Sequence, residues 1–466
     1  MHHFAPRPTA TTTPVSALTK KEYRAWRKKQ AKATLVWLDA TGFAPDIGKV
    51  ALLPARNGSI ARVVLGLGES PNLWSFAGLA AALPSKGRYA YDKLPVAHAN
   101  DAALAWALST YQFTRYKKPS RKFATLVWPD GADLGRVTRL AQGIELGRDL
   151  INTPAEDLGP AELVEAVKTL GAQHNAKVTV IKGDALLKNN YPTVHAVGRA
   201  ATRVPQLADL RWGAPGDPKV TLVGKGVCFD SGGLDLKSAA GMKLMKKDMG
   251  GAATALALAH AIMDAGLAVR LRVLIPTVEN AVAGNAYRPG DVLTTRKGLT
   301  VEIGNTDAEG RLILCDALCE ADSEEPEVLI DFATLTGAAR VALGTELPAL
   351  FSNDDELAQE ILTAGLAEDD AVWRMPLHAP YNRHLDSKIA DLNNIANIGQ
   401  GGAITAALFL QRFVSSKRSW AHLDTMGWNT GSRPGRPAGG DVFGVRAVYA
   451  ALEQRYPAAA QKTDEA

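Results

Sequence analysis

Apolar and polar positions in the first 130 residues form a mixture of strand-like and helix-like patterns. Short apolar runs typical of strands are KATLVWLDA (32–40), RVVLGLG (62–68) and FATLVW (123–128), and a helical pattern is DAALAWALSTYQF (101–113). We therefore predict a separate N-terminal α/β domain over residues 1–130. Its first residues, about 1–18, are rich in threonine and proline, and we expect them to form a disordered lead.

A longer helical pattern follows, from Asp133 to Leu150, and it runs into the sequence NTPAEDLGP. Asparagine, proline and glycine in this order are typical of a helix end. We predict that residues 131–153 form a helix that connects two domains.

Beyond this helix the pattern alternates between strands and helices. Alanine-rich segments of helical length separate five apolar, β-branched runs: KVTLVG, VRLRVLIPTV, LTVEIG, EVLIDFATL and SWAHLD. This rhythm is typical of a mostly parallel sheet with helices on both faces. The predicted fold class is therefore α/β, with a smaller N-terminal α/β domain and a larger domain over residues 154–466 built on a mostly parallel central sheet.

Composition restricts the class of protein. The chain has 466 residues, of which 46% are hydrophobic and 22% charged, so it is long enough to bury a large core. No run of about 18 apolar residues occurs, and the N-terminus lacks the apolar segment of a secretory signal, so we expect no contact with a membrane. The three cysteines (Cys228, Cys315 and Cys319) form no C-x-x-C pair, which suits a reducing cytoplasm.

The net charge of +5 comes partly from two basic clusters, KKEYRAWRKKQAK and RYKKPSRK. No recognised nucleic-acid-binding motif accompanies them, so a solvated basic surface is the favoured interpretation and nucleic acid is only weakly indicated as a partner.

Acidic residues follow the predicted strands of the second domain, where open α/β sheets carry their functional groups. Lys225 and Asp230 come after KVTLVG, Asp307 and Glu309 come after LTVEIG, and Asp248 precedes a predicted helix. Four carboxylates on one rim would repel each other unless a cation neutralised them. Oxygen ligands favour Mg²⁺ or Mn²⁺, although Zn²⁺ also accepts carboxylates.

Two lysines, Lys225 and Lys237, flank Asp230 in the glycine-rich stretch GKGVCFDSGGLDLKS. The spacing does not fit a phosphate-binding loop, and neither H-E-x-x-H nor G-x-S-x-G occurs. A lysine in a metal site can neutralise a carboxylate or stabilise an oxyanion. The residues alone thus predict a dinuclear hydrolytic site, and leave a peptide, ester or phosphate substrate open.

Four motifs, VGKGVCFDSGG, KKDMGGAA, NTDAEGRL and ATLTGAA, together resemble the leucyl (cytosol) aminopeptidase family of two-metal exopeptidases. Further matches extend the resemblance over about residues 148 to 447. It implies that residues 154–466 are a catalytic metallopeptidase domain. The implied activity is removal of a leucine-like residue, with broad tolerance, from peptides that have a free N-terminus.

The resemblance also implies roles for individual residues. The implied metal ligands are Lys225, Asp230, Asp248, Asp307 and Glu309; the catalytic residues are Lys237 and Arg311; and the substrate-binding residues are Thr334, Leu335 and Gly337. The implied cofactors are two divalent ions, Mn²⁺ or Zn²⁺ with Mg²⁺ as a further candidate, and a bicarbonate at Arg311. We expect Asp307, Glu309 and Arg311 to lie in an extended segment, where alternate residues face the same side.

Family resemblance further implies a homo-oligomer, in particular a homohexamer, in the cytoplasm. Two alternatives stay open: another two-metal hydrolase such as an esterase or phosphohydrolase, and a nucleic-acid-binding regulator that uses the basic N-terminal half.

Lys243 stands where family members often carry an acidic residue, close to Lys246 and Lys247. The family's usual preference for neutral apolar N-terminal residues is therefore left open for this chain.

Overall fold

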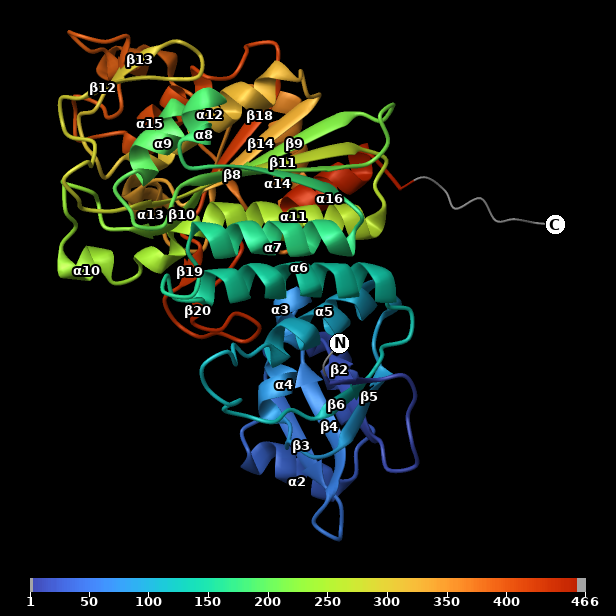
Figure 1. Cartoon of the computed structure of the whole chain (residues 1–466). Helices are drawn as coiled ribbons and strands as arrows, with labels where there is room; N and C mark the ends of the chain where they lie inside the picture. The colour runs from blue at the N-terminus through green and yellow to red at the C-terminus, as the bar shows by residue number, and fades with distance from the viewer. Residues whose placement is uncertain (1–2, 459–466) are drawn as a thin grey trace. The chain divides into compact units, whose positions relative to one another are not determined.

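The computed structural model describes residues 3–458, and the chain divides into two compact units. The first unit is Met1–Glu145 with Gly431–Ala438, and the second is Leu146–Thr430 with Gly439–Ala466. Figure 1 shows that both contain helices and sheets, as predicted for the fold class. Helix α6 (Leu134–Asn152) covers most of the segment for which we predicted a connecting helix.

The first unit is built on a six-stranded sheet in the order β1-β6-β5-β2-β4-β3. Neighbouring strands are parallel except β3 and β4, which are antiparallel. The strands are β1 (Phe4–Ala5), β2 (Thr13–Leu18), β3 (Val50–Pro54), β4 (Ile60–Gly66), β5 (Arg88–Lys93) and β6 (Thr125–Val127).

Two predictions for this unit are wrong. Residues 13–18 form strand β2 between β5 and β4, and β1 pairs with β6, so the described part of the expected lead is ordered; residues 1 and 2 lie outside the described residues. All of the last four residues of TPVSAL, Val15 to Leu18, are buried, and this burial outweighs the local threonine and proline content. The run KATLVWLDA forms helix α2 (Lys32–Ala40), in which Leu38 is the buried residue, because a short apolar run fits either structure.

The second unit contains a nine-stranded sheet. Its order is β16-β15-β18-β14-β9-β11-β8-β7, and β10 extends the sheet beside β11. The central strands β18, β14, β9 and β11 are parallel, and antiparallel strands follow on both sides. The central strands are β9 (Lys219–Gly224), β10 (Gly226–Asp230), β11 (Arg270–Asn280), β14 (Val328–Ala333) and β18 (Ser419–Asp424); the outer strands are β7 (Lys177–Lys182), β8 (Gln206–Trp212), β15 (Ala349–Ser352) and β16 (Trp373–Arg374).

One predicted strand lies elsewhere. The run LTVEIG supplies β13 (Thr300–Glu302), which belongs to a separate three-stranded sheet with β12 (Val292–Thr294) and β17 (Leu392–Asn393). The central sheet is thus mostly parallel as predicted, but β13 is not one of its strands.

Helices cover both faces of the large sheet (Figure 1). On one face lie α7 (Pro160–Gln173), α11 (Gly250–Ala265), α14 (Asp355–Ala367) and α16 (Val445–Arg455), and on the other lie α9 (Pro192–Gly198), α12 (Glu309–Ser323) and α15 (Gly402–Gln411). No helix among residues 3–458 is both long and apolar enough to cross a bilayer.

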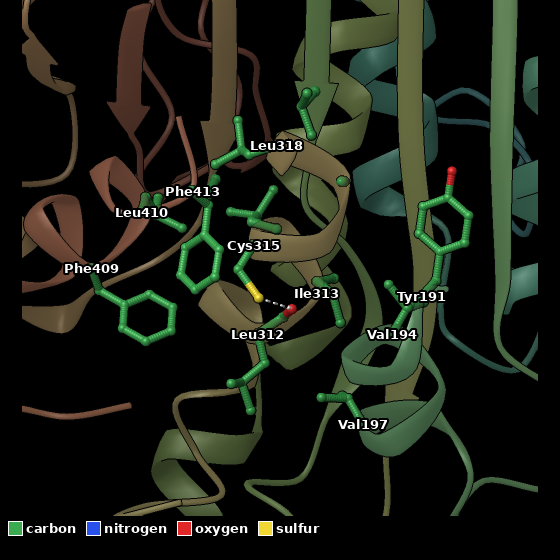
Figure 2. Packing of buried hydrophobic residues seen from close by; sticks show 14 of the residues in the cluster. Tyr191, Val194, Val197, Leu312, Ile313, Cys315, Leu318, Phe409, Leu410 and Phe413 are labelled. Atoms are coloured by element: carbon green, nitrogen blue, oxygen red, sulfur yellow. Dashed lines mark hydrogen bonds between the residues drawn. The ribbon is translucent and has the colours of Figure 1, made fainter. Parts of the chain in front are cut away.

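Helix α12 is held by the main core of the second unit. Figure 2 shows its side chains packed between α9 and the α15 region; the labelled residues are Leu312, Ile313, Cys315 and Leu318 of α12, Tyr191, Val194 and Val197 beside α9, and Phe409, Leu410 and Phe413 beside α15. Burying each large apolar side chain contributes roughly 1.5–3 kcal/mol. Cys315 belongs to this core, and its thiol donates a hydrogen bond to the carbonyl of Leu312 at 3.1 Å. The first residue of α12, Glu309, is therefore fixed in position.

A buried ion pair joins the end of α6 to the segment after β20 (Gly439–Gly440). Arg148 Nε donates to Asp441 Oδ1 at 2.9 Å, and Asn429 Nδ2 donates to Asp441 Oδ2 at 2.7 Å. Burial alone would raise the pKa of Asp441, but the charge of Arg148 outweighs it and lowers that pKa. The pair is therefore charged in the folded protein.

We predict that Asp441→Ala lowers the free energy of unfolding by about 3–5 kcal/mol, because the buried guanidinium of Arg148 would lose the carboxylate that it pairs with. Urea unfolding followed by circular dichroism measures this. The control is Glu165→Ala, whose partner Lys168 lies in an exposed pair and whose loss should cost no more than about 1 kcal/mol. Equal stability of the two variants would contradict the prediction.

Candidate metal centre

Lys225 lies at an interruption between two consecutive strands, β9 and β10. The Lys225 amide donates to the carbonyl of Phe332, and its carbonyl accepts from the amide of Ala252, both at 2.9 Å. These contacts bring β14 and the start of α11 very close. A Cβ at Gly224 would lie 2.6 Å from Ala252 Cα, so only glycine fits at this position beside the lysine.

The side chain of Lys225 is buried between two carboxylates. Its Nζ lies 2.7 Å from Asp248 Oδ2 and 2.8 Å from Glu309 Oε1, and it donates to the carbonyl of Thr334 at 3.1 Å. Asp248 belongs to the short 3-10 helix η2 (Met245–Met249), which leads into α11. The strand interruption, η2 and the first turn of α12 thus meet at one ammonium group.

Lys237 holds a second pair of carboxylates. Its Nζ lies 2.9 Å from Asp230 Oδ2 and also forms an ion pair with Asp307 Oδ1. Asp230 is the last residue of β10, and its other oxygen, Oδ1, accepts from the Gly232 amide and from Asn280 Nδ2, each at 2.9 Å. Asp230 is therefore fixed on both oxygens, whereas the side chain of Asp307 is 32% exposed.

The loop after β14 carries the three predicted substrate-binding residues. Thr334 donates through Oγ1 to Asp248 Oδ1 at 2.7 Å. The amides of Leu335 and Thr336 donate to Asp424 Oδ1 at 2.9 and 3.2 Å, and Gly337 then begins helix α13 (Gly337–Leu343). Asp424, the last residue of β18, thus fixes the backbone of this loop.

Arg311 lies apart from the other predicted residues. It is buried, its Nη1 donates to the carbonyl of Asn394 at 2.7 Å, and its Nε has no hydrogen-bond partner among the described residues. Burial lowers the pKa of Arg311 to about 10. The expected extended segment is wrong: α12 begins at Glu309, so Glu309 and Arg311 are two helical positions apart and lie about 200° apart around the axis.

One cavity of about 380 Å³ brings the remaining residues together. It is lined by Lys225, Asp230, Lys237, Asp248, Asp307, Glu309, Thr334, Leu335 and Gly337, and also by Ser238, Gly241, Met245, Lys247, Thr336, Arg340, Thr425 and Met426. All of the predicted site residues except Arg311 therefore line a single space.

The carboxylates of this cavity strongly affect one another. Burial, and then the charge of Asp230, raises the pKa of Asp307 to about 6 and the pKa of Glu309 well above its usual range. Burial alone would lower the pKa of Lys225, but Asp248 and Glu309 raise it far above the usual value. Lys225 can bind a cation only after its ammonium group has lost a proton. Because the neighbouring carboxylates stabilise the protonated form, a bound cation has to offset their negative charge.

The donor set fits divalent cations. Three buried oxygens, Asp248 Oδ2, Asp307 Oδ1 and Glu309 Oε1, form ion pairs with Lys225 or Lys237 but accept no hydrogen bond of normal geometry from the described residues. One oxygen from each of Asp230, Asp307 and Glu309 lies within 4.8 Å of the others. Unpartnered buried oxygens are rare unless an ion satisfies them, and oxygen donors suit hard divalent ions.

Sequence reasoning missed two supporting residues, Asn280 and Asp424. Each is the last residue of a central strand, so the rule that had located the carboxylates would also have found them. It also did not place Lys247 or Arg340 in the cavity, since neither belongs to a spacing pattern and only the folded chain brings them together.

Comparison with known families gives two matches. The catalytic domain of the cytosol aminopeptidase family matches residues 145–449, and the N-terminal domain of M17 aminopeptidases matches residues 13–129. A probable cytosol aminopeptidase of Rhodococcus opacus is 38% identical over 448 residues, covering 90% of this chain and 88% of the relative. One from Rhizobium johnstonii is 40% identical over 428 residues, covering 84% and 85%.

Two solved structures are also similar. The cytosol aminopeptidase of Coxiella burnetii is 48% identical with a TM-score of 0.94, and the match covers 98% of this chain and 100% of that one. The bottromycin maturation enzyme BotP in complex with Mn is 33% identical with a TM-score of 0.85, covering 96% and 100%.

Gly310, the second residue of α12, provides a test of the site. A Cβ at this position would lie 2.7 Å from Lys225 Nζ and 2.5 Å from its Cε, so Gly310→Ala should displace the flexible end of the lysine and leave the backbone in place. We predict that Mn²⁺ affinity, measured by calorimetry, falls roughly 10–100-fold, as for other residues that orient metal ligands.

The control for this variant is Gly216→Ala, because a Cβ at Gly216 would have no atom within 4 Å. Both variants should keep the parent circular dichroism spectrum. Parent-like Mn²⁺ affinity in Gly310→Ala would show that the position of Lys225 is unimportant for the ion.

Proposed function

Because the chain belongs to the cytosol aminopeptidase family, we propose that it removes leucine-like residues, with broad tolerance, from peptides by a two-metal mechanism. Membership makes the chain a metal-dependent exopeptidase, so the substrates are peptides. The observation that supports the mechanism is the clustering of four carboxylates and two lysines around one cavity.

Asp230, Asp248, Asp307 and Glu309, with Lys225 after loss of its proton, would hold the two cations. When bound, the cations polarise the scissile carbonyl and lower the pKa of a water molecule. Mn²⁺ agrees best with the oxygen donors and with the Mn complex of BotP, and Zn²⁺ and Mg²⁺ are the other candidates.

Lys237 is the residue that we propose to stabilise the oxyanion. Its side chain is only 15% exposed but lines the cavity. Burial alone would lower the pKa of Lys237, but Asp230 and Asp307 raise it, so the ammonium stays protonated at neutral pH. A positioned cation beside the developing charge on the carbonyl oxygen lowers the barrier to hydrolysis.

Arg311 is the residue that we propose to bind bicarbonate, the general base suggested by the family. The Nε of its buried guanidinium has no hydrogen-bond partner within residues 3–458, so it can donate to such an anion. Thr334, Leu335 and Gly337 would bind the substrate backbone, since Asp424 holds their loop rigid at the edge of the cavity.

We further propose a cytoplasmic homohexamer. The three thiols are free, as suits a reducing compartment, and the relatives are cytosol aminopeptidases. Val341, Leu366 and Ile389 of the second unit are 83%, 74% and 65% exposed, and neighbouring subunits would cover such apolar side chains.

Removing one carboxylate tests the metal site. We predict that Asp307→Ala and Glu309→Ala both abolish turnover and lower the metal content measured by atomic emission, while circular dichroism stays unchanged. Glu165→Ala, an exposed carboxylate outside the cavity, serves as the control. Full activity with a full complement of metal in either variant would refute the assignment.

The substrate's amino group tests the exopeptidase mechanism. We predict that leucyl anilide is cleaved and that its N-acetyl derivative reacts roughly a thousandfold more slowly or worse, a difference of about 4 kcal/mol. The reason is that acetylation removes the amine's electron pair as a metal donor and adds bulk where the peptide should begin. Rates within about tenfold of each other would indicate an endopeptidase or a general amidase.

A further inference from the structure

We propose that Lys247 and Arg340 form a subsite for a carboxylate group of the substrate, at one end of the catalytic cavity. This inference rests on the proposed peptidase function and adds a chemical class of substrate to it. Neither the ligand set nor the oxyanion role described above uses these two residues.

The charges that line the cavity divide into two groups. Four cations and four carboxylates line it. Lys225 contacts Asp248 and Glu309, and Lys237 contacts Asp230 and Asp307, so these two lysines already contact all four carboxylates. Lys247 and Arg340 are the two cations that these ion pairs leave over, and with them the formal charge of the lining is zero. Two bound divalent cations would therefore make the cavity positive, so that it could accept an anionic group of the substrate.

Lys247 is a buried cation without a satisfying partner. It is 5% exposed, its Nζ lies 4.0 Å from Asp248 Oδ1, and its ammonium makes no hydrogen bond to the described residues. Asp248 is already held by Lys225 and Thr334. Burying a charged group without a hydrogen-bonded partner is costly, so an ammonium that faces the cavity is suited to a ligand that supplies an anion.

Arg340 likewise has no carboxylate partner in the described part of the chain. It is exposed on α13, no acidic residue of the described chain pairs with it, and its Nη1 lies 4.0 Å from Met426 Sδ. Arg340 and Lys247 line the same cavity, so one ligand group can face both cations. A guanidinium can bind a carboxylate through two parallel hydrogen bonds.

The apolar surroundings define the rest of the ligand. Met245, Leu335 and Met426 line the same cavity, so the carboxylate should be attached to a short aliphatic stem. Two parts of a peptide have this chemistry: the side chain of an N-terminal aspartate or glutamate, and the C-terminal carboxylate of a dipeptide. Lys243, which the sequence had singled out, is exposed and does not line the cavity.

Two pairs of substrates, assayed with the full-length Mn²⁺-loaded enzyme, show which of the two carboxylates binds at the subsite. Glutamyl anilide against leucyl anilide tests the side chain, and leucyl-glycine against leucyl-glycine amide tests the C-terminus. In Arg340→Gln and Lys247→Met we expect kcat/KM for the charged member of one pair to fall about tenfold or more, mainly through KM, while the neutral member stays within about threefold.

Lys243→Gln is the matched control, since it removes one nearby positive charge outside the cavity. Loss in the anilide pair assigns the subsite to the N-terminal side chain, and loss in the dipeptide pair assigns it to the C-terminus. Unchanged ratios in Arg340→Gln, an exposed position that keeps the fold, would overturn the subsite even if Lys247→Met were unstable. Failure of the parent enzyme to cleave leucyl anilide would instead overturn the proposed function, and the subsite with it.

Discussion

Four carboxylates that repel one another have to be held within one small cavity, and much of the second unit can be understood from this constraint. Lys225 and Lys237 reduce the repulsion in the protein alone, each between two carboxylates. The rest of the unit keeps these groups from moving apart. Asp230 ends a sheet strand, Asp248 precedes a helix buried along most of its length, and Glu309 begins a helix whose next turns lie in the main core.

The same constraint explains where glycine is needed. The backbone at Gly224 touches Ala252, and Gly310 leaves room for the end of the Lys225 side chain. At both positions a methyl group would occupy space that the site requires. Glycine at positions 224 and 310 is thus required by close packing around Lys225 rather than by turn conformation.

Sequence patterns were sufficient for the fold class and for most of the site, because parallel strands bring their carboxyl ends to one edge. That rule located Lys225 and Asp230, whereas Asp248 was found because it precedes a predicted helix. It located Asp307 and Glu309 for an incorrect reason, since β13 lies outside the central sheet and α12 supplies Glu309 instead. The orientation of Arg311 could not be predicted by alternation, because the helix begins two residues before it.

Other features depend on long-range packing that no local pattern contains. Whether TPVSAL became a central strand depended on β4 and β5, which follow it by more than 40 residues. Lys247 and Arg340 come from two separate elements, and only the folded chain brings them to one cavity.

The interruption at Lys225 has a consequence for how the protein recognises ions. The lysine belongs to the same continuous segment as β9 and β10, hydrogen-bonded to β14 on one side and to α11 on the other. The backbone at Lys225 is therefore fixed as soon as the sheet folds. The conformational entropy of ordering this backbone is lost at that step, before any ion binds. In the proposed role of Lys225 as a ligand, this fixed backbone would favour cations whose size suits the distance already set by the sheet.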